Sequence, residues 1–292
     1  MSRPGNPAPA RPGARAAILL ALLAPCFWGS TYIVFTQTLP VEHPLLVAAL
    51  RALPAGILLM LLGAGLPPRE KLGRLLLLGL ANIGLFFALL FFSAARLPGG
   101  VAATLSSSQP LVVAFLAWPL LGRAPRAGQV LAALAGLAGV AMLVLDSRAQ
   151  LDLAGAVAAL LATCCMAMGT VLIERWGRLG TPLQLAAWQL ALGGAVLLPF
   201  ALLVEGVPPA PDARNLLGFA YLVLPGTALA YWLWVRGIAA AGARLSFFGL
   251  LSPVVATLLG ATLLGEWLAP VQMLGIVLVL GSTFAGMLLS RR

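Results

Sequence analysis

The chain has 292 residues, of which 61% are hydrophobic and only 9% are charged. A soluble domain carries roughly 25% charged residues, so this composition excludes a soluble globule and predicts an all-α polytopic membrane protein. The net charge of +10 would suggest nucleic-acid binding in a soluble chain. Here the basic residues are scattered over short loops, which indicates membrane topology instead, and we expect no nucleic-acid partner.

The chain begins with a segment rich in Pro, Gly, Ala and Arg that has no apolar face. Residues 1–15 are therefore predicted to form a disordered basic cytoplasmic tail. The apolar run that follows is too long and too aromatic for a signal peptide, so it is expected to be the first membrane helix. Ten apolar runs follow one another, each near the ~20 residues that a span needs. Their expected limits are 16–37, 44–64, 74–94, 99–121, 127–145, 153–175, 182–204, 214–236, 244–264 and 268–289.

The fourth and ninth runs resemble each other. In the fourth, three serines and Gln109 lie directly before Pro110 near the middle of the span, and Ser252-Pro253 matches this place in the ninth. The copies lie about 143 residues apart, nearly half the chain, which indicates an internal duplication. Polar groups beside a helix-breaking proline at that depth are tolerated where they face other helices or a wet cavity.

The duplication is visible in other helices too. Trp28–Ser30 aligns with Met168–Thr170, and Pro44 aligns with Pro182. Because each copy holds five helices, an odd number, the second must cross the membrane in the opposite direction. The predicted fold is ten transmembrane helices arranged as two inverted five-helix repeats, an architecture suited to alternating access. The predicted repeats are 16–145 and 146–292.

The loop charges predict the orientation of the chain. With the N-terminus inside, the inner segments hold most of the basic residues, whereas the outer segments hold Arg96, Arg148 and Arg214 and most of the acids. This is a strong positive-inside bias. Both termini are therefore expected to be cytoplasmic.

Three motifs support a resemblance to a known family. They are PCFWGSTY in the first helix, AALRAL in the second and LLSPVVATLLGATLLGE in the ninth, and the sequence resembles the EamA family of the drug/metabolite transporter superfamily over essentially all of 16–290. Within that family it is similar to the YddG type of amino-acid exporter. The resemblance implies a multi-pass protein of the bacterial inner membrane that exports small metabolites, commonly amino acids. The first repeat departs from the family pattern, because Gly122-Arg123 stands where the second has Gly265-Glu266.

The candidate substrate-binding residues are neutral polar or aromatic side chains near the middle of the spans. For the aromatic ones, helix packing is the commoner alternative. For Asn82 and the serines, burial without partners would cost about 1–3 kcal/mol each, which favours a polar cavity. The candidates are Trp28, Thr31, Tyr32, Asn82, Phe86, Ser106, Ser107, Gln109, Met168, Tyr231, Trp232, Ser246 and Ser252.

The hairpins between helices three and four and between helices eight and nine are candidate gates. Their glycines and the nearby prolines can absorb hinge motion. Ordinary tight loops and small-residue helix packing are an equally good interpretation. The candidate gating residues are Gly99, Gly100, Pro110, Gly242 and Pro253.

Arg51 is the one charged residue placed well inside a predicted span. It could pair with a substrate carboxylate, but we favour a structural role in which it snorkels to the outer interface or bonds helix carbonyls. No Asp or Glu lies at mid-span, which argues against a protein-borne proton relay and favours facilitative transport. A phosphorylated substrate would need clustered cations, so neutral or zwitterionic substrates fit better.

These features predict an exporter of amino acids, aromatic or apolar ones included, that works by alternating access. No catalytic motif is visible, so we expect no enzyme activity. The cysteines Cys26, Cys164 and Cys165 form no metal or disulfide pattern, and we expect no metal, no cofactor and a monomer in the lipid bilayer. A lipid flippase or scramblase and a proton-coupled drug exporter remain as alternatives.

Overall fold

The structure is a computed structural model, and it describes residues 14–144, 152–177, 179–241, 249, 251–265 and 267–289. In these residues all regular secondary structure is helical, and each helix is nearly continuous in apolar side chains. Sequences of this kind bury their backbone hydrogen-bonding groups within the helix itself, as a bilayer requires.

The first half contains eight α-helices and the second contains six among the described residues. They are α1 (Ala14–Ala21), α2 (Leu23–Thr38), α3 (Pro44–Leu59), α4 (Leu72–Gly79), α5 (Phe86–Ala94), α6 (Gly99–Ser106), α7 (Gln109–Leu121), α8 (Ala127–Val144), α9 (Leu153–Trp176), α10 (Pro182–Glu205), α11 (Ala213–Val223), α12 (Ala230–Ala241), α13 (Leu251–Leu259) and α14 (Pro270–Leu289). Short π-helical or 3₁₀ segments join or extend them: η1 (Met60–Ala64), η2 (Arg69–Lys71), η3 (Leu80–Leu85), η4 (Leu224–Leu229) and η6 (Gly260–Leu264).

Within the described residues, seven helical segments are long and apolar enough to cross a membrane, and three shorter apolar helices accompany them. Their outer faces carry large exposed apolar side chains, such as Leu61 and Leu203, which are 80% and 85% exposed. Exposed apolar surface on this scale needs lipid around it. The chain is therefore an integral membrane protein with multiple apolar helices.

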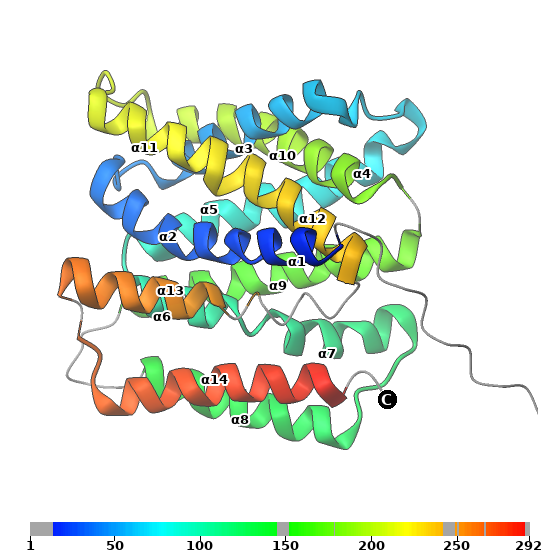
Figure 1. The fold of residues 1–292 in the computed structure, drawn as a ribbon, viewed down its shortest axis with the longest axis vertical. Coiled ribbons are helices and arrows are strands. Elements are labelled where there is room, and N and C mark those ends of the chain that lie inside the picture. Colours follow the sequence, from blue (N-terminus) through cyan, green and yellow to red (C-terminus); the bar gives the residue numbers. More distant parts are fainter. Residues whose placement is uncertain are drawn as a thin grey trace, which may run out of the picture.

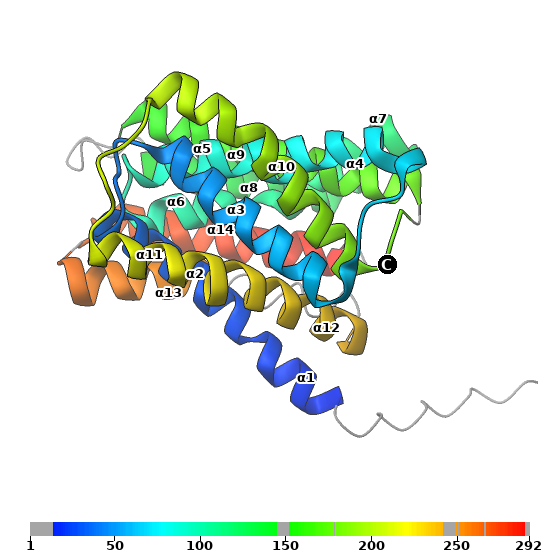
Figure 2. The same ribbon diagram turned by 90° about the horizontal axis from the view of Figure 1, so that it is seen from above.

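The helices lie side by side as a bundle (Figure 1), and α1, α2, α3 and α10 are inclined to the others (Figure 2). The first helix begins and the last helix ends at the same end of this bundle (Figure 1). Two contacts join helices that are equivalent in the predicted repeats: α3 packs along α10, and α8 packs along α14. A two-fold relation between the halves would produce such pairing of equivalent helices. The count of ten spans stays a prediction.

Small residues allow α3 and α10 to approach closely. A Cβ atom added at Gly194 would lie 2.6 Å from the backbone nitrogen of Leu53, and one added at Gly56 would overlap the backbone of Ala191. In lipid the hydrophobic effect does not drive helices together. The van der Waals contacts that such close backbone approach permits stabilise the packing instead.

The fourth span is broken, as expected for a helix with an internal proline. α6 ends at Ser106 and α7 begins at Gln109, with Pro110 in its first turn. The break lies at Ser107 and Ser108. Pro110 has no backbone N–H, so it cannot continue the hydrogen-bonding pattern of the preceding helix. The polar end of α6 therefore meets the start of α7 inside the bundle.

The third and eighth spans contain a π-helical segment each, η3 and η4, and these segments lie about one repeat length apart. η3 carries Asn82 and η4 carries Gly226 and Thr227. A π-helical turn inserts an extra residue and shifts the hydrogen-bonding register of the helix, and such turns occur frequently at functional sites.

Candidate functional site

A cavity of about 1020 Å³ opens between the two halves of the chain. Its walls come from both predicted repeats: α2, α3, η3, α5, α6, α7 and α8 in the first, and α9, α10, α12, α13 and α14 in the second. Binding sites for small ligands commonly measure ~300–1,000 Å³. The cavity is therefore large enough for a small metabolite together with water.

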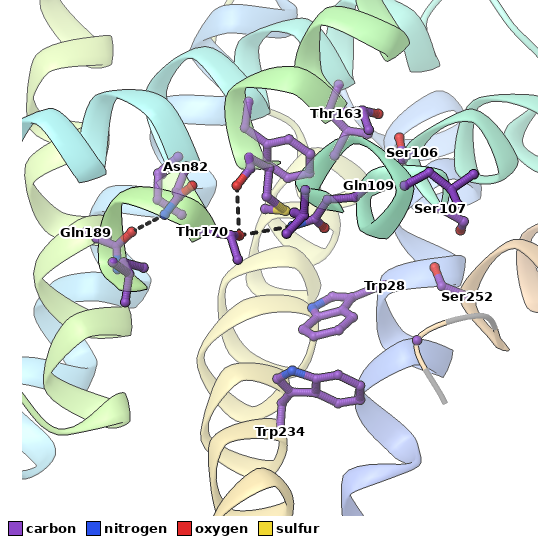
Figure 3. A pocket seen from close by; sticks show the side chains of 18 of the residues that line it. Trp28, Asn82, Ser106, Ser107, Gln109, Thr163, Thr170, Gln189, Trp234 and Ser252 are labelled. Carbon is purple, nitrogen blue, oxygen red and sulfur yellow. Dashed lines mark hydrogen bonds between the residues drawn. The ribbon is translucent and has the colours of Figure 1, made fainter. Parts of the chain in front are cut away.

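Two hydrogen bonds across the halves hold neutral polar groups at the cavity wall (Figure 3). The Asn82 side-chain nitrogen donates to Gln189 Oε1 at 2.6 Å, and the Gln109 side-chain nitrogen donates to Thr170 Oγ1 at 3.1 Å. Asn82 and Gln189 are buried at 8% and 6% exposure. The Asn82–Gln189 bond satisfies groups that would be costly to bury alone, whereas the Gln109–Thr170 bond is exposed to the cavity. The Asn82 Oδ1 atom accepts no hydrogen bond in the described residues and is available to a ligand.

The serines at the break in the fourth span are also satisfied. Ser106 Oγ and Ser107 Oγ donate to the carbonyl oxygens of Ala102 and Ala103 at 3.0 and 2.9 Å. Because each hydroxyl uses its one proton on the preceding turn, its oxygen can act toward the cavity only as an acceptor. This end of the cavity therefore offers acceptor oxygens to a substrate donor.

Aromatic rings form another part of the wall. The Trp28 ring lies 5.2 Å from that of Trp234 and 5.8 Å from that of Tyr231, both in edge-to-face geometry. Trp28 and Trp234 come from opposite halves and stand next to each other (Figure 3). Such a cluster suits a flat apolar or aromatic group.

Arg51 lines the cavity and is only 3% exposed. Its Nε donates to Thr227 Oγ1 at 2.6 Å, and its Nη2 donates to the Gly226 carbonyl oxygen at 3.0 Å. The guanidinium carbon lies 4.7 Å from the ring centroid of Phe87 and 5.6 Å from that of Phe91. The side chain is therefore buried and bonds a helix carbonyl, rather than extending to the outer interface.

Charged residues line one end of the cavity. Arg123 and Arg126 lie after α7, and Glu174 lies in the last turn of α9. Arg123 forms an ion pair with Glu174, and both side chains are exposed. This end is a polar mouth, whereas the region around Arg51 is enclosed by apolar and aromatic groups.

The structure brings most of the predicted binding residues to this one cavity. Those that line it are Trp28, Thr31, Tyr32, Asn82, Phe86, Ser106, Ser107, Gln109, Tyr231 and Ser252.

Two predicted residues do not line the cavity: Met168 and Trp232. On α9 the cavity is reached by Met166 and Thr170, and Met168 lies about 200° around the helix from either. Trp232 follows the lining residue Tyr231 by one position, and its ring is 37% exposed and packs under Arg236. Ser246 and Gly242 lie outside the described residues.

Of the other candidate gating residues, Gly99 and Gly100 lie at close helix contacts, and Pro110 lies in the first turn of α7. A Cβ at Gly99 would be 2.9 Å from the Cβ of Tyr32, one at Gly100 would overlap Thr257, and Pro253 is buried. Small-residue packing accounts for the two glycines, and a hinge role for any of these residues stays a prediction.

Gln189 is a lining residue that the sequence reasoning missed. The alignment of Pro44 with Pro182 places Gln189 opposite Arg51 in the other repeat, and this signal could have found it. Among the described residues there is no group of three or more His, Cys, Asp or Glu side chains that could hold a metal ion.

Comparisons with known proteins define the class to which this fold and cavity belong. The EamA-like transporter family matches residues 15–145 and again 153–287, so the chain belongs to this family of membrane transporters. The chain is 47% identical to "Protein PecM" of Dickeya dadantii over 262 residues, which cover 89% of this chain and 88% of that protein. It is 30% identical to the "Uncharacterized inner membrane transporter YedA" of Escherichia coli over 258 residues, 85% of this chain and 83% of that protein. A solved crystal structure matches with a TM-score of 0.66 at 20% identity, covering 95% of this chain and 98% of its own, which supports the fold.

Proposed function

We propose that the protein exports small neutral or zwitterionic metabolites, amino acids above all, across the bacterial inner membrane by alternating access. The observation that carries the proposal is a cavity to which both halves contribute, with neutral polar and aromatic groups in its wall and most of its charged groups at the mouth. Rocking of two inverted halves around such a site would expose it to each side in turn. The likeness to exporters of the YddG type points to the same substrate class.

Facilitative movement fits the chemistry of the lining. Glu174, the acidic side chain among the described lining residues, is exposed near the mouth and paired with Arg123. A proton-coupled carrier would need a carboxylate or histidine that titrates within the membrane. We therefore propose that the substrate gradient drives transport, which sets this protein apart from a proton-coupled drug exporter.

The proposed orientation places both termini in the cytoplasm. The mouth lined by Arg123 and Arg126 lies in the segment between α7 and α8, which the positive-inside rule assigns to the cytoplasmic side. In that orientation the cavity is loaded from the cytoplasm, as export requires.

The direct test is uptake of radiolabelled amino acids into proteoliposomes that contain the purified protein, with and without an imposed pH gradient. We expect saturable uptake of aromatic or other apolar amino acids, at a rate that the pH gradient leaves unchanged. Uptake that rises several-fold with the pH gradient would contradict the facilitative mechanism. Protein-free liposomes provide the background.

The same vesicles separate the proposal from the lipid alternative. A labelled phospholipid placed in the outer leaflet should stay there, since the proposed substrates are water-soluble. If the protein moves the lipid between leaflets and no amino acid enters, a flippase or scramblase would replace the proposed function.

A further inference from the structure

We propose that Arg51 binds the carboxylate of the transported molecule and makes the cavity selective for substrates that carry one. The inference rests on the proposed transport through this cavity and names its substrate class more narrowly. Arginine presents five N–H donors in a planar fork that matches a carboxylate. Thr227 and Gly226 accept hydrogen bonds from two of these donors, so the other three have no acceptor among the described residues.

The positive charge of Arg51 is stabilised but not neutralised. Phe87 and Phe91 stack on the guanidinium, and the described residues provide two ion pairs, neither of which includes Arg51. A cation over an aromatic face is attracted to the ring and keeps its charge. A buried cation without a counter-ion is unfavourable unless an anion reaches it. Since Arg51 lines the cavity, a substrate carboxylate can supply that anion.

The other repeat shows that the fold does not require a charge at this position. The displacement that aligns Pro44 with Pro182 also aligns Arg51 with Gln189. Gln189 accepts a hydrogen bond from Asn82 in η3, and Arg51 donates one to Thr227 in η4. The segments η3 and η4 are themselves about one repeat apart. A neutral amide is thus sufficient for the interhelical hydrogen bond at the equivalent position of the other repeat. Helix packing therefore does not explain the charge of Arg51, whereas binding of an anionic ligand does.

The rest of the lining fits a carboxylate joined to an aromatic group. Arg123 and Arg126 at the mouth, together with Arg51, outnumber Glu174 among the described lining residues, so the cavity attracts anions. Trp28, Tyr231 and Trp234 supply the aromatic wall.

The test compares binding of matched acids and amides by the full-length protein in lipid nanodiscs. The pairs are 3-phenylpropionate with 3-phenylpropionamide, and phenylalanine with phenylalaninamide. Binding is followed by tryptophan fluorescence, because Trp28 and Trp234 line the cavity. The wild type should bind each acid at least about tenfold more tightly than its amide, the range of a hydrogen-bonded charge pair.

Arg51→Gln copies the residue found at the equivalent position and should lose this preference while binding the amides as the wild type does. Arg51→Lys should keep part of it, because the charge remains but the fork is lost. Arg74→Gln is the matched control: Arg74 is exposed, packs on Trp176 and does not line the cavity, so this variant should keep the full preference.

Equal wild-type affinity for acids and amides, an unchanged preference in Arg51→Gln, or no binding of any of the four compounds would overturn the inference. If Arg51→Gln fails to fold, Arg51→Lys carries the test, and an unchanged preference there would overturn it. Binding of 3-phenylpropionate needs neither an amino group nor transport, so the inference can hold if amino-acid transport fails. If the protein transports amino acids but shows no preference for acids over amides, the inference about Arg51 is overturned and the proposed transport function stands.

Discussion

Two glycines that align in the repeat, Gly29 and Gly169, lie where segments from different parts of the bundle cross. A Cβ at Gly29 would come within 2.5 Å of the Ser252 carbonyl oxygen, and one at Gly169 would overlap the Asn82 side chain. Only a residue without a side chain permits these contacts. Gly169 therefore sets the position of Asn82 at the cavity wall.

Gly169→Ala should displace Asn82, weaken its bond to Gln189 and lower amino-acid transport several-fold. Overpacking of this kind costs about 1–3 kcal/mol in folding free energy. Thermal unfolding and proteoliposome uptake would check both effects. Gly281→Ala is the control, since a Cβ there meets no atom within 4 Å. Wild-type unfolding and transport in Gly169→Ala would show that Asn82 does not depend on this glycine.

The site residues that could be predicted from the sequence are those whose polarity distinguishes them from the apolar span around them. Asn82, Gln109 and the serine pair are polar groups in apolar spans, and burial rules direct them to a cavity. The side on which an aromatic residue faces was harder to predict, because it depends on helix rotation, and Trp232 and Tyr231 are adjacent in sequence. The partners of Arg51 also could not be derived from one sequence, because they lie on a distant span.

At the scale of elements, the start of α9 is fixed by Asp152. Its carboxylate accepts a hydrogen bond from the Gly155 N–H at 3.1 Å and pairs with Arg96 at 2.8 Å. The hydrogen bond from Arg96, and then that from Gly155, lower the pKa of Asp152 below its usual value. An ionised cap at a helix N-terminus stabilises the exposed N–H groups there.

The lowered pKa predicts how stability depends on pH. A group whose pKa is lower in the folded state contributes stability above its unfolded pKa, and this contribution disappears as the pH falls through the folded value. Asp152→Asn keeps a capping side chain without the charge. It should lower the melting temperature at neutral pH by a small amount, and the difference from wild type should vanish in acid. Melting curves over a pH series would check this, and a difference that persists in acid would contradict it.

Within the described residues, the positions of the apolar helices followed closely from the sequence, because about 20 apolar residues are needed to span a bilayer. The break before Pro110 followed from the missing proline donor. The π-helical segments η3 and η4 did not, because one extra residue in a turn leaves no mark on an apolar sequence. These unpredicted turns hold Asn82 at the cavity wall, and they place Gly226 and Thr227 as hydrogen-bond acceptors for Arg51.

For the whole molecule, the sequence alone supported a duplicated membrane protein, and the match of one family to 15–145 and 153–287 accords with it. The location of a cavity between the halves required the structure, since it depends on how α3, α10 and their neighbours pack. In the proposed mechanism this cavity opens to each side of the membrane in turn.

That claim is tested most directly with a single cysteine in the cavity wall. Ala114 lines the cavity, so Ala114→Cys in a chain whose Cys26, Cys164 and Cys165 are replaced by alanine would report its exposure. The account predicts that a membrane-impermeant thiol reagent labels this cysteine from both faces of the membrane, and that a transported amino acid slows the labelling. Labelling from one face alone, with and without substrate, would contradict alternating access.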